Sequence, residues 1–220
     1  MDLNRNKVID IQLVQKNVVG GSYHMELEGL KLGVAAIGME QLKIQALVTD
    51  RHAQVAKWIR ENLKDIQHYY DVWHVAKSLG KRVRAIGKEK DCEVVQEWAR
   101  SINNHVYWVA SSTPSGDPNE MLGKFMSLKN HIQNIHTGHS EHFPNCLHPP
   151  IQERNRKKWL KPGSKACKKL SDLLEKRHFL KDIQKLSPHR QTSGVEAFHG
   201  TIIHFAPKML VYSYNGMFTR

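Results

Sequence analysis

The sequence contains few cysteines and no long apolar segment. Cys92, Cys146 and Cys167 are its only cysteines, too few and too scattered for a disulfide framework, so a reduced, intracellular protein is the simplest interpretation. No apolar run approaches the roughly 18 residues of a membrane span, and no signal peptide is visible. We therefore expect no membrane partner. The 40% hydrophobic content suffices for a folded core, which excludes wholesale disorder.

Acidic residues are also scarce. Asp and Glu number 21 against 33 Lys and Arg, which gives a net charge of +12. Between Pro150 and Arg190 there are thirteen basic residues and only four acidic ones. Such a concentrated positive charge predicts a polyanion partner, most often nucleic acid, although a solvated basic surface is the alternative.

Eight basic residues of this segment surround Trp159. They are Arg154, Arg156, Lys157, Lys158, Lys161, Lys165, Lys168 and Lys169. Lys and Arg neutralise phosphates, and an aromatic ring stacks on unpaired bases, so the segment is a candidate DNA-binding surface. The alternative is a solvated face with Trp159 buried among helices.

The periodicity of apolar residues predicts an α/β fold. Alternation over residues 9–13, after a turn at 4–6, predicts a strand, and further strands are expected at 44–48 and 67–70. Helices are expected to alternate with them, at 22–38, 51–63 and 72–86, as in a parallel sheet. After residue 86 only helical patterns follow, at 93–110, 120–136, from Ser164 onward and at 192–205. We therefore expect a core at residues 1–86, a basic helical insertion at 87–190, and a returning helix with a tail at 191–220.

Two of the expected strands end in an aspartate, Asp50 and Asp71, directly before a helix. Sites in parallel sheets lie at the carboxyl ends of strands, and paired carboxylates suit Mg²⁺ or Mn²⁺. The alternative is that each aspartate caps the following helix. Glu196 has a similar structural interpretation, because Ser193 and Glu196 have the spacing of a capping box.

Histidines gather with a cysteine between residues 136 and 148. Zinc prefers imidazole and thiolate ligands, so His136, His139, Cys146 and His148 are candidate ligands of a structural Zn²⁺. His131 and His142 are competing ligands. A polar loop with unpaired histidines is the other interpretation.

Several segments together resemble animal DDE-type DNA transposases, and the Kolobok-like group is the nearest. The resemblance rests on Val48–His52, Tyr69–Lys77, Leu186–Pro188, Thr192–His199 and His204–Lys208, which occur in the order of the family. It covers essentially the whole chain.

This resemblance implies an RNase H-like core with a mixed sheet, interrupted by a helical insertion. In that family three carboxylates hold two divalent metals, Mg²⁺ or Mn²⁺, for DNA cleavage and strand transfer. Asp50 matches the second carboxylate and Glu196 the third. Asp71 and His74 match an Asp/Cys-x-x-His motif that follows the second carboxylate in several such superfamilies.

The sequence departs from the family pattern at its start. The strand that carries the first catalytic aspartate is not matched, because Asp2 and Asp10 belong to later strands, and the DNA-recognition module is also unmatched. We therefore expect an N-terminally truncated, transposase-derived nuclear protein that is catalytically inactive as given and prone to self-association. The alternative is a domesticated, non-enzymatic nuclear protein that binds DNA or protein.

Overall fold

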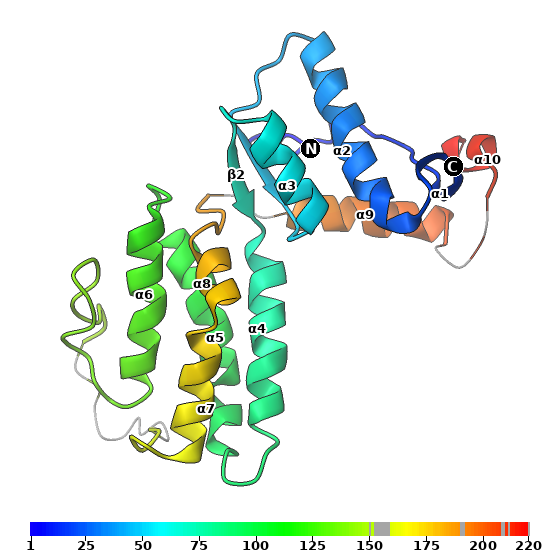
Figure 1. Cartoon of the computed structure of the whole chain (residues 1–220). Coiled ribbons are helices and arrows are strands. Elements are labelled where there is room, and N and C mark those ends of the chain that lie inside the picture. Colours follow the sequence, from blue (N-terminus) through cyan, green and yellow to red (C-terminus); the bar gives the residue numbers. More distant parts are fainter. Residues whose placement is uncertain (150, 152–158, 190–191, 208–209, 211, 220) are drawn as a thin grey trace. The chain divides into compact units, whose positions relative to one another are not determined.

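The computed structural model describes residues 1–149, 151, 159–189, 192–207, 210 and 212–219 (Figure 1). The chain divides into two compact units: residues 1–69 with 190–220, here called the α/β unit, and residues 70–189, here called the helical unit. Helix α4 (Val72–Ile86), which the sequence led us to expect in the first domain, packs in the helical unit. Among the described residues, no helix combines the length and the apolar character needed to span a lipid bilayer.

The α/β unit contains a small parallel sheet of two strands, in which the Gln67 amide donates to the Gln45 carbonyl over 3.1 Å. Helix α2 packs against α1 and α3. The last residue of β2 already belongs to the helical unit. The elements of the α/β unit are α1 (Lys16–Val19), α2 (Ser22–Met39), β1 (Ala46–Thr49), α3 (Ala53–Asn62), β2 (Gln67–Tyr70), α9 (Ser193–Phe205) and α10 (Tyr214–Phe218).

The N-terminal segment corrects one expectation. A turn does form at residues 3–6, closed by an antiparallel bridge between Asp2 and Lys7. The strand expected at 9–13 does not form, since residues 8–15 have no regular secondary structure. Ile9 is 50% exposed and Ile11 is 63% exposed, so the alternation of apolar residues here does not bury one face against a core.

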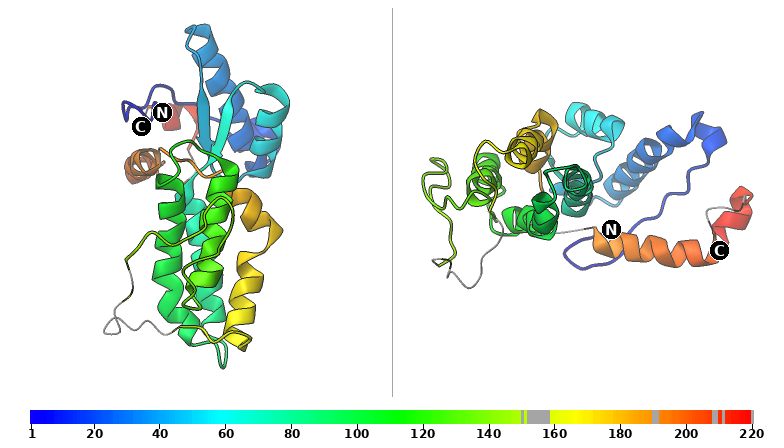
Figure 2. Two further views of the ribbon diagram at one scale, coloured as in Figure 1. Left: turned by 90° about the vertical axis from the view of Figure 1, so that its left-hand side faces the viewer. Right: turned by 90° about the horizontal axis from the view of Figure 1, so that it is seen from below.

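The helical unit consists of five described helices, of which α4, α5, α6 and α7 lie side by side, while α8 continues beyond the end of α7 (Figure 2). Side-chain caps fix the starts of three of them: Asp71 accepts from the Trp73 amide, Asp117 from Glu120 and Ser164 from Cys167. Helix α6 ends at His131, earlier than the expected residue 136, because Asn134 adopts a left-handed conformation with φ of 63°. The helices are α4, α5 (Val94–Ser111), α6 (Pro118–His131), α7 (Lys165–Leu174) and α8 (Arg177–Ile183).

The hydrophobic core lies in the helical unit. Trp98, Phe125 and Phe179 are its largest buried side chains, and all are at most 2% exposed. They come from α5, α6 and α8. Burial of one such side chain contributes about 1.5–3 kcal/mol, so packing between the helices dominates the stability of this unit.

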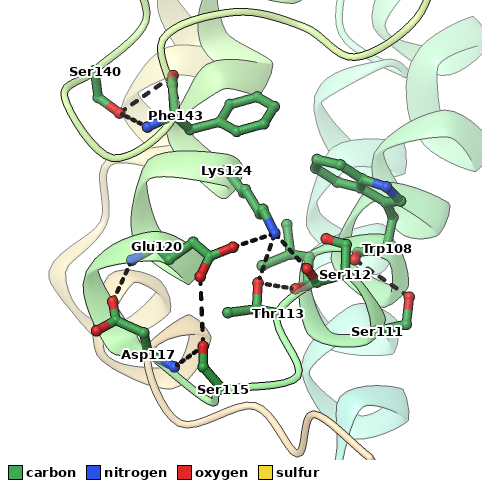
Figure 3. A network of polar contacts seen from close by, with 11 residues as sticks. Trp108, Ser111, Ser112, Thr113, Ser115, Asp117, Glu120, Lys124, Ser140 and Phe143 are labelled. Atoms are coloured by element: carbon green, nitrogen blue, oxygen red, sulfur yellow. Dashed lines mark hydrogen bonds and ion pairs between the residues drawn. The ribbon is translucent and has the colours of Figure 1, made fainter.

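A buried lysine joins α5 to α6 (Figure 3). The Lys124 ammonium pairs with Glu120 at 2.6 Å, donates to the Ser112 carbonyl over 2.6 Å and to the Thr113 hydroxyl over 3.1 Å. Its side chain is only 7% exposed. All three partners accept from the ammonium, which offsets the cost of burying its charge.

The chain returns to the end of β2 shortly before it leaves the helical unit. Tyr70 forms a parallel bridge with Leu186. The Tyr70 amide donates to the Lys185 carbonyl over 2.6 Å, and the Ser187 amide donates to the Tyr70 carbonyl over 3.0 Å. Backbone pairing therefore fixes the Leu186–Pro188 motif within the helical unit.

Candidate metal-binding and DNA-binding sites

Asp50 lies at the carboxyl end of β1 and is half-buried. The preceding Thr49 hydroxyl lies 2.8 Å from His68 Nε2 on the neighbouring strand. Helix α3 has His52 as its N-cap, without a side-chain cap bond. The N-cap of this helix is therefore His52 and not Asp50, which precedes it by two residues.

Glu196 lies in the first turn of α9 and is exposed. The expected capping box does not form, because Thr192 is the N-cap and Ser193 is already helical. The start of this helix lies close to the N-terminal turn. A Cβ at Gly194 would come within 2.8 Å of Met1 Cε and would also meet the Asn6 side chain, so a larger residue here would displace these two side chains. Both Glu196 and Asp50 belong to the α/β unit.

Asp71 and His74 belong to the helical unit. The Asp71 carboxylate is 1% exposed and accepts from the Trp73 amide over 2.9 Å, which confirms the capping interpretation for this aspartate. One of its oxygens lies within 4.8 Å of a ring nitrogen of His74. A capping bond uses one lone pair only, so the predicted catalytic role of this pair stays a prediction.

A second group of metal-ligand side chains lies at the end of α6 and in the loop that follows. His131, His136, Cys146 and His148 each offer one ligand atom, and these four atoms lie within 4.8 Å of one another. Three of the four were predicted from the sequence. His131 takes the place expected for His139, whose Nε2 lies 3.2 Å from Cys146 Sγ.

Partial burial alters the protonation of this group. Loss of hydration, reinforced by the neighbouring His148, lowers the pKa of His136. The same loss, reinforced by His136, lowers the pKa of His139. Burial also raises the pKa of the Cys146 thiol. The rings of His136 and His139 thus favour the neutral form, which is the form that binds metals, while the Cys146 thiolate needs a nearby cation.

The predicted basic segment is only partly described. Arg154, Arg156, Lys157 and Lys158 lie outside the described residues. Lys165 donates to the Lys90 carbonyl over 2.6 Å, and Lys169 pairs with Glu89. The half-buried Trp159 packs on the hydrophobic core, 5.4 Å from the Trp98 ring, while Lys161 and Lys168 are exposed.

A groove that the sequence analysis missed runs between α4 and α5. It encloses about 510 Å³ and is lined by aromatic, basic and amide side chains. The Lys77 ammonium lies 4.0 Å from the centre of the Trp73 ring. The groove is lined by Trp73, Lys77, Arg84, Gln96, Ala99, Arg100, Asn103 and Tyr107. Lys77, Lys81 and Arg84 follow the spacing of one helical face, a signal that was present in the sequence.

No curated protein and no solved structure matches this chain. A protein-family profile does match it. The profile of the family described as Mutator-like transposase matches residues 7–147. This range includes Asp50, Asp71, His74 and the α4–α5 groove. Family membership implies DNA binding, DNA recombination and the use of divalent metals. The match extends over more than half of the sequence, and the chain therefore belongs to the Mutator-like transposase family.

Proposed function

We propose that Asp50 and Glu196 are ligands of Mg²⁺ or Mn²⁺ in DNA-directed chemistry of the DDE type. The observation that carries this proposal is the family match, together with the place of Asp50 directly after β1, at the carboxyl end of the strand. Carboxylate oxygens are the ligands that these hard cations prefer. When bound, such ions stabilise the attacking and leaving oxygens of a phosphoryl displacement.

The fold proposed around these residues is an RNase H-like core of Kolobok-like type, interrupted by the helical unit. Three observations support it: the parallel pairing of β1 and β2, the return of the chain to Tyr70 at Leu186, and α9 following that return. The resemblance of Tyr69–Lys77 and Thr192–His199 to that group favours this subtype. A solved structure with further strands beside β1 would support the proposal.

Residues 1–220 by themselves are proposed to bind DNA without cutting it. Only Asp50 and Glu196 match the acidic positions of the family, whereas two-metal cleavage uses three. Mg²⁺ gives up its hydration reluctantly, so two carboxylates hold it weakly. We expect no conversion of supercoiled plasmid to the nicked form with Mg²⁺ or Mn²⁺. Robust nicking that Asp50→Ala abolishes would overturn the inactivity and retain the role of Asp50.

Mn²⁺ binding, followed by electron paramagnetic resonance, tests the ligand assignment directly. We expect weak binding that is lost in Asp50→Asn/Glu196→Gln. The matched control is Glu40→Gln/Glu61→Gln, which removes the same charge from two exposed positions of the α/β unit. Equal binding by both double variants would contradict the assignment.

The α4–α5 groove is proposed as the DNA-contacting surface of the helical unit. Lys77, Arg84 and Arg100 supply positive charge for phosphates, while Trp73 and Tyr107 supply rings that stack on unpaired bases. The groove brings both kinds of side chain together. In the described part of the predicted basic segment, by contrast, Lys165 and Lys169 contact protein groups and Trp159 packs on the core.

Salt-dependent fluorescence anisotropy with labelled DNA compares three double charge reversals. Arg84→Glu/Arg100→Glu is expected to weaken binding about tenfold or more and to flatten the salt dependence by about 0.9 in slope per lost phosphate contact. Lys161→Glu/Lys168→Glu tests the predicted segment. Lys176→Glu/Lys181→Glu makes the same charge change at exposed positions that lie outside the groove and outside residues 154–169. Equal losses in the first and third variants would refute the groove assignment.

A non-enzymatic nuclear DNA-binding protein is the second candidate. The observation that favours it is the helical unit, which combines its own hydrophobic core with the basic groove and lacks Glu196. DNA binding that is unchanged in Asp50→Asn/Glu196→Gln, without metal binding by these residues, would favour this candidate. We place the protein in the nucleus because DNA is the implied partner, and imaging of a tagged chain tests this location.

A further inference from the structure

The imidazole rings of three histidines converge on one point beside a cysteine. The ring centres of His131, His136 and His148 lie 4.8–5.2 Å apart in all three pairings. Cys146 Sγ lies 3.6 Å from His131 Nδ1. In a tetrahedral zinc site, bonds of about 2.0–2.3 Å separate neighbouring ligand atoms by about 3.3–3.8 Å, which matches this sulfur–nitrogen distance.

Hydrogen bonds outside the group fix two of these rings. His136 Nε2 lies 3.0 Å from Asn134 Oδ1 and donates to it. His136 Nδ1 therefore carries a lone pair, and this atom is buried without a hydrogen-bond partner among the described residues. His148 Nδ1 donates to the Pro149 carbonyl over 2.8 Å, which leaves Nε2 as its lone-pair nitrogen. Metal-binding histidines show this pattern, since the second nitrogen orients the ring.

His139 lies beside the sulfur and is bound differently. The Asn130 amide donates to His139 Nδ1 over 3.2 Å, so Nε2 carries the proton and points to Cys146 Sγ at 3.2 Å. An N–H donor of this kind stabilises a thiolate that is bound to a metal. The hydrogen bonds thus separate His136 and His148, each of which keeps one nitrogen with a lone pair, from His139, which offers a proton.

The backbone holds the group together across a short hairpin. Thr137 bridges Asn145, and the Cys146 amide donates to the His136 carbonyl over 2.8 Å. His131 comes from the last residue of α6, and its ring packs against Trp98 and Trp159 at 5.8 and 5.7 Å. The group is therefore supported by a helix end, a hairpin and two indole rings.

We propose that His131, His136, Cys146 and His148 bind one Zn²⁺ in a closed, structural site. Three neutral imidazoles and one thiolate form a set of donors that binds Zn²⁺ in preference to Mg²⁺ or Ca²⁺, which favour oxygen ligands. Because all four positions of a tetrahedral site are taken by protein ligands, none is left for a substrate. Bound zinc ties the loop at 136–148 to the end of α6. The site does not include Asp50 or Glu196, so its tests are independent of the tests of the proposed DNA chemistry.

Metal content of the purified full-length chain gives the first test. By inductively coupled plasma mass spectrometry we expect about one zinc per chain. His131→Asn and Cys146→Ser should lose most of it, whereas His142→Asn, a change to an exposed histidine of the same loop, should retain it. Retention in His131→Asn with loss in His139→Asn would overturn the ligand set. Absence of zinc from the wild type after growth with added zinc would overturn the site.

Cobalt substitution of the wild-type chain removes any dependence on how the variants fold. Co²⁺ added to the metal-free protein should give the intense visible bands of a tetrahedral site and a sulfur-to-cobalt charge-transfer band, and stoichiometric Zn²⁺ should displace both. If Cys146→Ser remains folded, it should lose the charge-transfer band alone. A weak octahedral spectrum, or bands that Zn²⁺ does not displace, would refute the proposal.

Discussion

The two units differ sharply in how they bury apolar side chains. Among the described residues, the α/β unit contributes only Val55, Ile59 and Ala206 to the buried hydrophobic set, and the helical unit contributes the rest. Of the sixteen exposed large hydrophobic residues, twelve belong to the α/β unit. The predicted carboxylate ligands Asp50 and Glu196 thus lie in the unit with little core, while the unit with the core carries the basic groove and the His/Cys group.

The exposed apolar residues of the α/β unit support the proposal that the chain self-associates. Large exposed apolar patches in soluble proteins mark interaction surfaces or aggregation sites. Sedimentation velocity over a range of concentrations should show species larger than a monomer. Sedimentation as a monomer at all concentrations would refute self-association and leave the contrast between the units intact.

Truncating one phenylalanine in each unit, one buried and one exposed, gives the largest expected difference between the units. Phe125 is fully buried in the helical unit, so Phe125→Ala should lower the free energy of unfolding by about 3–5 kcal/mol. Phe218 is 75% exposed in the α/β unit, so Phe218→Ala should change it by less than about 0.5 kcal/mol. Urea unfolding followed by circular dichroism measures both. Similar losses in the two variants would contradict a core confined to the helical unit.

Lys124 tests whether the polar network strengthens the helical unit. Lys124→Ala leaves the Glu120 carboxylate and the Ser112 carbonyl without their shared donor, and should cost about 2–4 kcal/mol in urea unfolding. Lys129 forms a more exposed ion pair with Glu175 and provides the control. Lys129→Ala should cost less than about 1 kcal/mol. A larger cost for Lys129→Ala than for Lys124→Ala would refute the importance of burial here.

His105 makes the stability of the helical unit depend on pH. Burial lowers its pKa from 6.5 to about 4, against the opposing effect of the hydrogen bond that its Nε2 donates to the Lys124 carbonyl. The unfolded chain therefore binds the proton first, and stability is lost as the pH falls from about 6.5 toward 4. Between pH 7 and pH 5 this histidine should account for about 2 kcal/mol of that loss. His105→Gln keeps a donor but does not titrate, so an unchanged pH dependence in this variant would contradict the assignment.

The smallest effect is expected in the N-terminal segment. Ile11 is 63% exposed, so Ile11→Thr should change the free energy of unfolding by less than about 0.5 kcal/mol. A small effect agrees with the irregular, exposed segment in the structure, whereas the strand that the alternating sequence predicts would bury Ile11 and give a large effect. A loss above about 1.5 kcal/mol would show that this side chain is buried after all.

Elements with clear terminal signals were predicted well. The sequence placed β2 and α4 at the residues that the structure shows, because Asp71 ends the strand and caps the helix. The alternating segment at 9–13 misled the prediction, since alternation indicates a strand only where one face is buried. His131 was ranked below His139 because sequence spacing does not show that α6 stops early and turns back at Asn134.

The bridge between Tyr70 and Leu186 has a topological consequence for engineering. Two parallel segments cannot be joined by a tight turn, because the chain must travel back along the strand before pairing again. The helical unit is therefore an oversized crossover connection. A shortened protein that keeps this pairing would need a replacement of at least about a dozen residues, whereas a hairpin-length linker would reverse the direction of the returning segment.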